Sequence, residues 1–271
     1  MTLNVLMAII VTLYALASVL AIRSLAQPST TLASRQNRML LLALASSLVF
    51  HGILLKLQIF TAAGLNLSFG YAMSLVMWVI TLLYLLTGLF RRATNIGAVI
   101  LPLDIITLII VMFLPSNTLI ASGSPLLHLH IAIAVLAYSL LALAGIQALF
   151  VNSQEKALRQ HQARQINLQL PPLEAMEALL FNLLWGGFIL LTLTLVSGVF
   201  FSEQIFGKAF VINHHIVLSA SAWLVFGIFL FGHWRWGWRG KNALHWTIGG
   251  LSLLILGYFG TKFVLEFMLG K

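Results

Sequence analysis

Long uninterrupted runs of apolar residues recur along the whole chain and limit it to one class of fold. Each run holds about 18 or more apolar residues, which as a helix can cross a hydrocarbon core of roughly 30 Å. Hydrophobic residues make up 61% of the sequence, charged residues make up 8%, and the mean hydropathy is +1.02. A soluble domain needs more polar surface than this. The sequence therefore predicts an all-α, polytopic membrane protein in which residues 1–271 form a single membrane domain.

Eight transmembrane helices are expected from these runs. They cover residues 3–22, 39–60, 70–90, 96–114, 126–151, 178–200, 215–232 and 244–268. The first run lacks the basic start of a secretory signal, so we expect it to be retained as a helix. In the polar connection 152–177, the fifth helix should extend until Pro171 and Pro172 stop it. The segment "LEAMEALLF" that follows resembles a short interfacial entry into the sixth helix.

Positive charge divides the connections between helices into two groups. One group carries eleven basic residues: Arg23, Arg35, Arg38, Arg91, Arg92, Lys156, Arg159, Arg164, Arg235, Arg239 and Lys241. The other group has only Lys208 and Lys271, while Lys56 and Lys262 are close enough to helix ends to reach the interface. Because cytoplasmic loops carry the excess of Lys and Arg, both termini are predicted on the outer face of the membrane. The net charge of +9 thus indicates topology and not nucleic-acid binding.

Several kinds of catalytic chemistry find no support in the sequence. It has no phosphate-binding loop, no paired catalytic carboxylates and no Ser/His/Asp arrangement. Cysteine is absent, which excludes disulfides, thiolate metal sites and thiol exchange by this chain.

Histidines at helix ends are the strongest candidates for a site. They are His51 inside the second helix, His128 and His130 at the outer end of the fifth, His214 and His215 at the outer end of the seventh, and His233 and His245 at the inner ends of the last two. Residues two apart on a helix point about 200° apart, so one of His128 and His130 faces away from the bundle, and we favour His130 as inward. The same geometry leaves His214 and His215 open.

A bis-histidine haem site is one interpretation of this set. Two histidines from different helices form the usual low-spin axial pair for a b-type haem within a bundle. Taken singly, a boundary histidine more often satisfies helix-end groups or lies at the headgroup level. Asp104, inside the fourth helix, has two interpretations as well: a proton or cation path, or a buried acid that holds the helix in place, which we favour.

The cytoplasmic stretch "HWRWGWRGKNALHW", residues 233–246, combines four tryptophans with Arg235, Arg239 and Lys241. Tryptophan and arginine at this depth usually anchor helices and attract anionic lipid. The same residues could instead contact haem propionates and a porphyrin face.

Segments from residue 40 to 270 resemble the integral membrane cytochrome c assembly family, the CcsA-, ResC- and HemX-like haem-handling proteins. The matching segments are "HIAIAVLAY", "LPPLEAME", "SGVFFSEQIFGKAF", "FLFGHW", "GWRGKNA" and "YFGTKF". By this resemblance His130 would correspond to an outer haem ligand and His233 to an inner one. The last 50 residues carry the most specific matches.

The chain also departs from this family. Members that attach haem to cytochrome c carry a tryptophan-rich outer loop, whereas this chain has "FGKAFVINHHIVLSASAW", with no tryptophan before Trp223 and no aspartate. The family's second outer histidine, beyond the last helix, is missing, and His214 or His215 is our candidate replacement. Direct attachment of haem to apocytochrome is therefore not expected, and we predict that the chain is not an enzyme.

Two functions follow from these observations. The first is a haem-binding or haem-handling inner-membrane protein, with haem b held by His130 and one of His214 or His215. A second haem position would use His233 and Arg235, with His51 as a mid-membrane ligand or relay. The alternative is an accessory subunit of another inner-membrane protein, for example in divalent cation homeostasis, with the haem site lost and a glycine stripe at Gly249, Gly250 and Gly257 facing the partner.

Overall fold

The computed structural model describes residues 3–26, 31–62, 64–90, 96–113, 119–120, 125–160, 171–206 and 214–268. Almost all of these residues are helical, and seven helices are long and apolar enough to cross a membrane. The chain divides into two compact units. Unit 1 comprises Met1–Ile120 and Gln154–Leu173, and unit 2 comprises Ala121–Ser153 and Glu174–Lys271. The prediction of an all-α, polytopic membrane protein is confirmed at this level, whereas the apolar runs alone do not mark the division into units.

The helices coincide with the predicted apolar runs and extend several of them. They are α1 (Leu3–Ala26), α2 (Thr31–Ile59), α3 (Phe69–Phe90), α4 (Gly97–Phe113), α5 (Pro125–Arg159), α6 (Leu173–Phe206), α7 (His214–Trp236) and α8 (Lys241–Ile255). The last helix continues through two π-helical segments, η2 (Leu256–Gly260) and η3 (Val264–Met268), which are joined by the short helix α9 (Thr261–Phe263). With 17 residues, α4 is about 26 Å long and is not among the seven helices long enough to span.

The fifth helix was expected to extend until Pro171 and Pro172, but α5 ends at Arg159 and a turn follows at Gln160. The segment "LEAMEALLF" forms the first turns of α6, which runs without a break from Leu173 to Phe206, so it leads into the sixth helix as expected. Met176 and Leu180 in its first turns are buried, and the side-chain amide of Gln147 donates a hydrogen bond of 2.9 Å to the carbonyl oxygen of Met176. Packing against α5 therefore keeps this segment helical, directly after Pro172 ends the polar connection.

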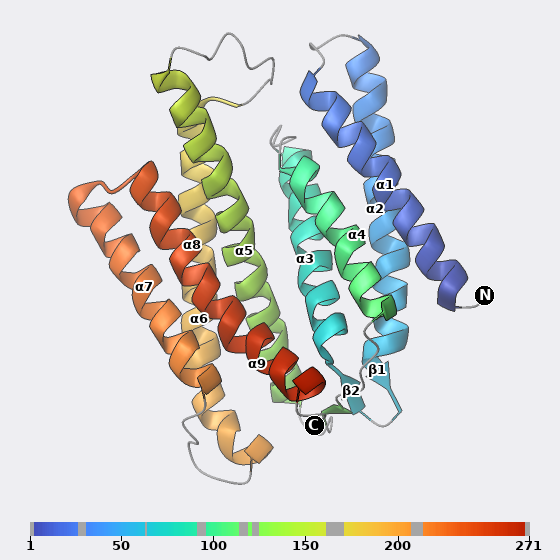
Figure 1. The fold of residues 1–271 in the computed structure, drawn as a ribbon, viewed down its shortest axis with the longest axis vertical. Coiled ribbons are helices and arrows are strands. Elements are labelled where there is room, and N and C mark those ends of the chain that lie inside the picture. Colours follow the sequence, from blue (N-terminus) through green and yellow to red (C-terminus); the bar gives the residue numbers. More distant parts are fainter. Residues whose placement is uncertain are drawn as a thin grey trace. The chain divides into compact units, whose positions relative to one another are not determined.

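In unit 1 the helices α1 to α4 form a bundle (Figure 1). Helix α1 packs against α2 and α4, and α3 packs against the same two helices. Large apolar side chains fill the centre, among them Ile10, Leu44, Ile80 and Ile100, each at most 1% exposed. The polar side chains described below are buried among them.

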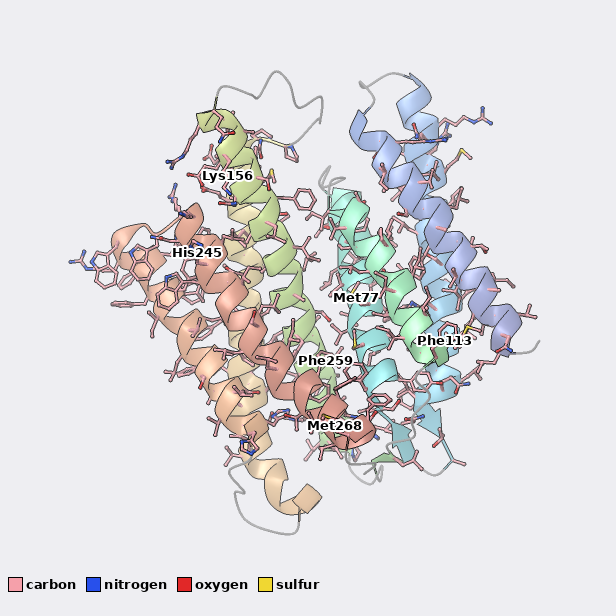
Figure 2. The ribbon with its side chains drawn as sticks, in the orientation of Figure 1. Met77, Phe113, Lys156, His245, Phe259 and Met268 are labelled. Carbon is pink, nitrogen blue, oxygen red and sulfur yellow. The ribbon has the colours of Figure 1, made fainter. Side chains whose placement is uncertain are left out.

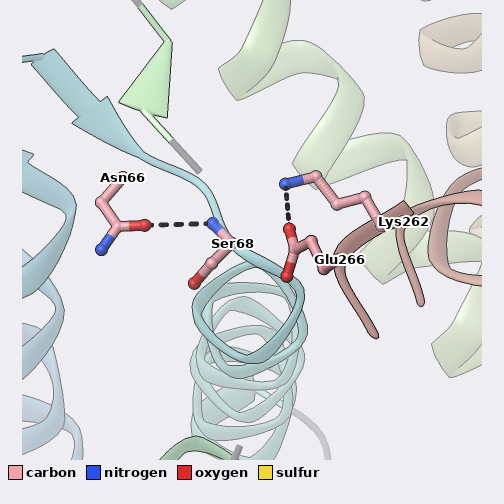
Figure 3. A network of polar contacts seen from close by, with 4 residues as sticks. All are labelled: Asn66, Ser68, Lys262 and Glu266. Atoms are coloured by element: carbon pink, nitrogen blue, oxygen red, sulfur yellow. Dashed lines mark hydrogen bonds and ion pairs between the residues drawn. The ribbon is translucent and has the colours of Figure 1, made fainter. Parts of the chain in front are cut away.

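Short strands at one end of unit 1 join its helices. They are β1 (Phe60–Thr61), β2 (Gly64–Asn66) and β3 (Leu119–Ile120), in an antiparallel sheet of order β1-β2-β3. Gly64 has φ 137°, which suits glycine. The side-chain oxygen Oδ1 of Asn66 accepts a 3.2 Å bond from the backbone N–H of Ser68, just before α3 (Figure 3). Strands this short leave no alternating pattern, so the apolar runs did not predict them.

In unit 2 glycines let the helices approach closely (Figure 1). A side chain at Gly187 of α6 would collide with Leu141 of α5, and one at Gly145 of α5 would collide with Leu251 of α8. Gly250 of α8 lies against the ring of Phe226 on α7, 2.7 Å from where a Cβ would stand. These contacts fix the bundle that carries the histidines.

The predicted orientation depends partly on residues outside the described ranges. Five of the basic residues used for that prediction lie outside the described ranges: Arg91, Arg92, Arg164, Lys208 and Lys271. The placement of both termini on the outer face therefore stays a prediction.

Candidate functional site

His130 of α5 faces α6 in unit 2. Its Nδ1 lies 2.7 Å from the hydroxyl oxygen of Ser197, and its Cε1 lies beside Gly198, 3.6 Å from where a Cβ would stand. His128, two residues earlier, is exposed. The helical periodicity that favoured His130 as the inward residue agrees with this arrangement.

The hydroxyl of Ser197 determines which nitrogen of His130 carries the proton. Ser197 donates its own hydrogen to the carbonyl oxygen of Leu193 at 2.6 Å. It must therefore accept the bond from His130, so Nδ1 is the protonated nitrogen and the lone pair is on Nε2. This is the tautomer of a typical metal-binding histidine, whose other ring nitrogen is held by a hydrogen-bond acceptor.

His215 on α7 turns toward the same interior region of unit 2. His130 and His215 are close enough for a proton on one to act electrostatically on the other. The neighbouring His214 is exposed, whereas His215 is half-buried. The structure thus separates the pair that the sequence left open, with His215 inward.

Aromatic rings border His215. Tyr258 lies edge-on to it with ring centroids 5.7 Å apart, and Tyr138 of α5 is 5.9 Å from Tyr258. The wide turns of η2 present Tyr258 and Phe259 on adjacent faces, with their rings 5.0 Å apart. Such π-type turns are rare and occur frequently at functional sites.

A lysine from the last helix approaches this aromatic group. The ammonium of Lys262 lies 5.9 Å from the ring centre of Tyr258 and 3.3 Å from Oε1 of Glu266, one turn further along the helix (Figure 3). The side chains of Lys262 and Glu266 are 15% and 4% exposed. Charged groups buried at this depth are expensive and usually belong to functional sites.

His233 at the end of α7 has a similar tautomer. Its Nδ1 donates a 2.8 Å bond to the carbonyl oxygen of Trp238, so the lone pair again resides on Nε2. One face of its ring stacks on Phe181 of α6, with the centroids 3.4 Å apart. His233 therefore has a ring nitrogen suited to bind a metal, but it lies among aromatic side chains, at a different site from His130 and His215.

A turn at residues 237–240 packs the tryptophans together. Gly237 and Gly240 have φ of 67° and 57°, which glycine adopts without strain, and the ring of Trp238 lies directly on Gly232. The rings of Trp236, Trp238 and Trp246 stack in sequence, with centroids 5.7 and 5.6 Å apart.

Basic residues surround this turn. Arg235 and Lys241 are exposed, and the guanidinium of Arg239 is 3.9 Å from the carboxylate of Glu177. His245, at the same end of unit 2, is also exposed (Figure 2). The arrangement is typical of an interfacial anchor, and an exposed Arg235 is free to reach an acidic group.

His51 belongs to unit 1 and is completely buried. Its Nδ1 is 3.0 Å from the hydroxyl of Tyr14 on α1, and its Nε2 is 2.8 Å from the hydroxyl of Ser74 on α3. Both ring nitrogens are thus occupied by hydroxyl groups. This arrangement suits a relay or a structural link better than an iron ligand, because an iron would have to replace one of the two bonds.

Asp104 is also completely buried in unit 1. Thr81 of α3 donates a short hydrogen bond to Oδ2, while Oδ1 has no hydrogen-bond partner among the described residues. The bond to Thr81 links α4 to α3, as expected for a buried acid that holds its helix in place.

Two further expectations, on the outer connection and on the glycine stripe, are tested only in part by the described residues. Residues 207–213 of the outer connection that lacks tryptophan lie outside the described residues. In the glycine stripe, Gly250 and Gly257 are covered by residues of α7, and Gly249 alone has open space around it. Within the described chain, the stripe therefore serves mainly the packing of α8 on α7.

Sequence reasoning missed the hydroxyl partners Ser197, Tyr14, Ser74 and Thr81. The only available signal was a polar residue within an apolar run, which is common in helices that bond their own backbone. Contacts between helices far apart in sequence are needed to distinguish these from the rest.

The model of the family described as "Cytochrome C assembly protein" matches residues 38–269. The inner membrane protein YpjD of Escherichia coli (strain K12) is 29% identical over 231 residues, which cover 84% of this chain and 87% of that protein. Protein HemX of Brevibacillus brevis is 24% identical over 189 residues, 68% of this chain and 69% of that one. The cytochrome c biogenesis protein CcsA of Prochlorococcus marinus (strain AS9601) is 23% identical over 213 residues, 69% of each chain. No solved structure matches significantly.

Proposed function

Because this chain belongs to the cytochrome c assembly protein family, we propose that it handles haem and binds haem b at the outer end of unit 2. His130 and His215 would be the axial ligands. The observation that supports this most is the hydrogen bond from His130 to Ser197, which leaves the lone pair on Nε2. His215 is the second imidazole within electrostatic reach.

The residues present fit a haem in chemical terms. Two neutral imidazoles from different helices supply the donor pair of a low-spin b-type haem, which brings one-electron redox chemistry when bound. Tyr258 and Tyr138 supply an aromatic border, and Lys262 carries a cation for a propionate. The chain's own part is to orient the imidazoles and to keep them neutral.

A second haem position at the inner end of α7 is the weaker proposal. His233 would be the ligand, and the exposed Arg235 would pair with a propionate. His51 would act as a relay inside unit 1, since hydroxyl groups occupy both of its nitrogens.

The membrane arrangement belongs to the same proposal. The chain is a multi-pass membrane protein, and the similarity to an inner membrane protein supports a location in the bacterial inner membrane. We propose eight crossings, with α4 as the eighth, and both termini on the outer face. We expect no catalytic reaction by this chain, whose candidate site offers binding groups for haem.

The optical spectrum of the detergent-purified protein, oxidised and then reduced with dithionite, tests this function. We expect a reduced low-spin b-type spectrum that is lost in His130→Ala and retained in His128→Ala, a matched control one half-turn away. A colourless protein that also fails to take up added haem would contradict the proposal and favour the accessory-subunit function.

A further inference from the structure

Four helices of unit 1 bring a set of buried polar side chains together in its apolar interior. They are Tyr14 of α1, Ser47 and His51 of α2, Ser74 and Thr81 of α3 and Asp104 of α4, each at most 1% exposed. Polar groups at this depth destabilise a membrane protein unless they are hydrogen-bonded or functional. The axial pair proposed above, His130 and His215, lies in unit 2, and of the residues in this set only His51 has been given a role so far, as a relay within unit 1.

The surroundings of Asp104 keep its carboxyl group neutral. The group is completely buried, and no Lys, Arg or His forms an ion pair with it among the described residues. An ionised carboxylate in such a place would be far more costly than a protonated one. Thr81 donates to Oδ2, so Oδ2 is the acceptor oxygen and the acid proton belongs on Oδ1.

Oδ1 is the oxygen without a hydrogen-bond partner among the described residues. A buried O–H group seeks an acceptor. The hydroxyl of Tyr14 is within electrostatic reach of Asp104, and α1, which carries it, packs against α4. One water between Oδ1 and the Tyr14 hydroxyl would give the acid proton an acceptor.

From Tyr14 the polar contacts continue in measured steps. The Tyr14 hydroxyl is 3.0 Å from Nδ1 of His51, and Nε2 of His51 is 2.8 Å from the hydroxyl of Ser74. An imidazole can accept a proton at one nitrogen and release one from the other, which makes histidine suitable for proton transfer. Tyr14 precedes the residues that the family model matches, so this chain of contacts is not confined to the shared family region.

We propose that unit 1 holds an exchangeable proton on Asp104 and that Tyr14, His51 and Ser74 carry it to and from that site. In outward transfer, His51 releases its Nε2 proton to Ser74, Tyr14 passes its hydroxyl proton to Nδ1, and Asp104 gives its proton to Tyr14. Each intermediate group gains one proton for the one it loses, Asp104 becomes a carboxylate, and water accepts the proton beyond Ser74.

Residues that face the acid from each packed helix contribute to this site. Helix α3 supplies Thr81, α1 supplies the buried Tyr14, and His51 of α2 is connected through Tyr14. No cationic side chain among the described residues of these helices is paired with the acid, so its charge state depends on proton exchange. Burial of a new negative charge makes the release unfavourable unless it is coupled to another event, such as uptake of a positive charge.

Infrared spectroscopy of the full chain in detergent tests the proposal without any measure of activity. The native protein should show the carbonyl stretch of a protonated carboxyl group at neutral pH, and the band should shift on transfer to deuterated water. Asp104→Asn should abolish it, since amide and acid have nearly the same shape. Thr81→Val should raise its frequency by removing a hydrogen bond to the carbonyl oxygen. Thr107→Val, which loses a bond only to the Asp104 backbone, should leave the band in place.

The role of the relay is tested by Tyr14→Phe, which keeps the ring and removes the hydroxyl. We expect the band to persist but to exchange at least about tenfold more slowly, because one link in the hydrogen-bonded chain is missing. Native protein without the band would overturn the proposal. A band that appears only after sodium or potassium is removed would assign the site to a monovalent cation, and a band that never exchanges would reduce Asp104 to a structural acid.

Discussion

Nδ1 of His130 donates a 2.7 Å hydrogen bond to the hydroxyl of Ser197, and Ser197 donates in turn to the carbonyl oxygen of Leu193. The bond joins α5 to α6 and fixes both the direction of the imidazole and its tautomer. A histidine that only lies at the headgroup level needs neither a fixed ring direction nor a fixed tautomer. The bond therefore supports a binding role for His130 and provides the first test.

Ser197→Ala should weaken haem binding although His130 itself is not substituted. Loss of the acceptor leaves the ring free to rotate and to place its proton on either nitrogen. Groups that orient a metal-binding histidine typically contribute about tenfold to 100-fold in affinity. Titration of the purified protein with haem measures the change. Ser221→Ala, which removes a hydroxyl bonded only to its own helix, should not alter the affinity.

Gly250→Ala should destabilise unit 2 by about 1–3 kcal/mol, the usual effect of overpacking. The new Cβ would stand 2.7 Å from the ring of Phe226, which is completely buried and cannot move aside freely. Gly249→Ala is the matched control, because nothing lies within 4 Å of its Cβ position. Thermal unfolding in detergent compares the two. Equal stability of both variants would contradict the close packing of α8 on α7.

His233→Ala should loosen the turn at residues 237–240. The substitution removes the bond to the carbonyl oxygen of Trp238 and the stacking on Phe181, together worth about 1–3 kcal/mol. Tryptophan fluorescence and limited proteolysis at the turn report the change. The exposed His245 is the control, and His245→Ala should behave as the native protein does.

Arg239→Gln should change stability by less than about 1 kcal/mol, as is usual for an exposed ion pair. The guanidinium is 3.9 Å from Glu177 and 65% exposed, so water screens the attraction. Unfolding at low and high salt measures it. A large, salt-dependent loss would assign this ion pair a greater structural role than its geometry supports.

The helices could be predicted because length and hydropathy are local properties of the sequence. The structure extends the predicted run 178–200 to Leu173–Phe206, since contacts of Met176 and Gln147 keep the first turns helical. These contacts come from another helix and leave no local pattern. The strands β1 to β3 were missed for the same reason, because two or three residues are too few for a periodicity.

The site could be predicted only up to the choice between neighbouring residues. A separation of two positions on a helix distinguishes His130 from His128, because the pair point to opposite sides. Adjacent residues are about 100° apart, so His214 and His215 required the contact of His215 with Tyr258 to be separated. The partners of His51 lie 37 and 23 positions away in sequence, which only the packing of three helices reveals.

Imidazole rescue of His215→Gly is the most direct measurement of the haem site. The variant should bind haem with an altered, five-coordinate spectrum, and added imidazole should restore the low-spin spectrum of the native protein by occupying the space left by the side chain. His214→Gly, its exposed neighbour, should keep the native spectrum throughout. A native low-spin spectrum in His215→Gly before imidazole is added would contradict axial ligation by His130 and His215.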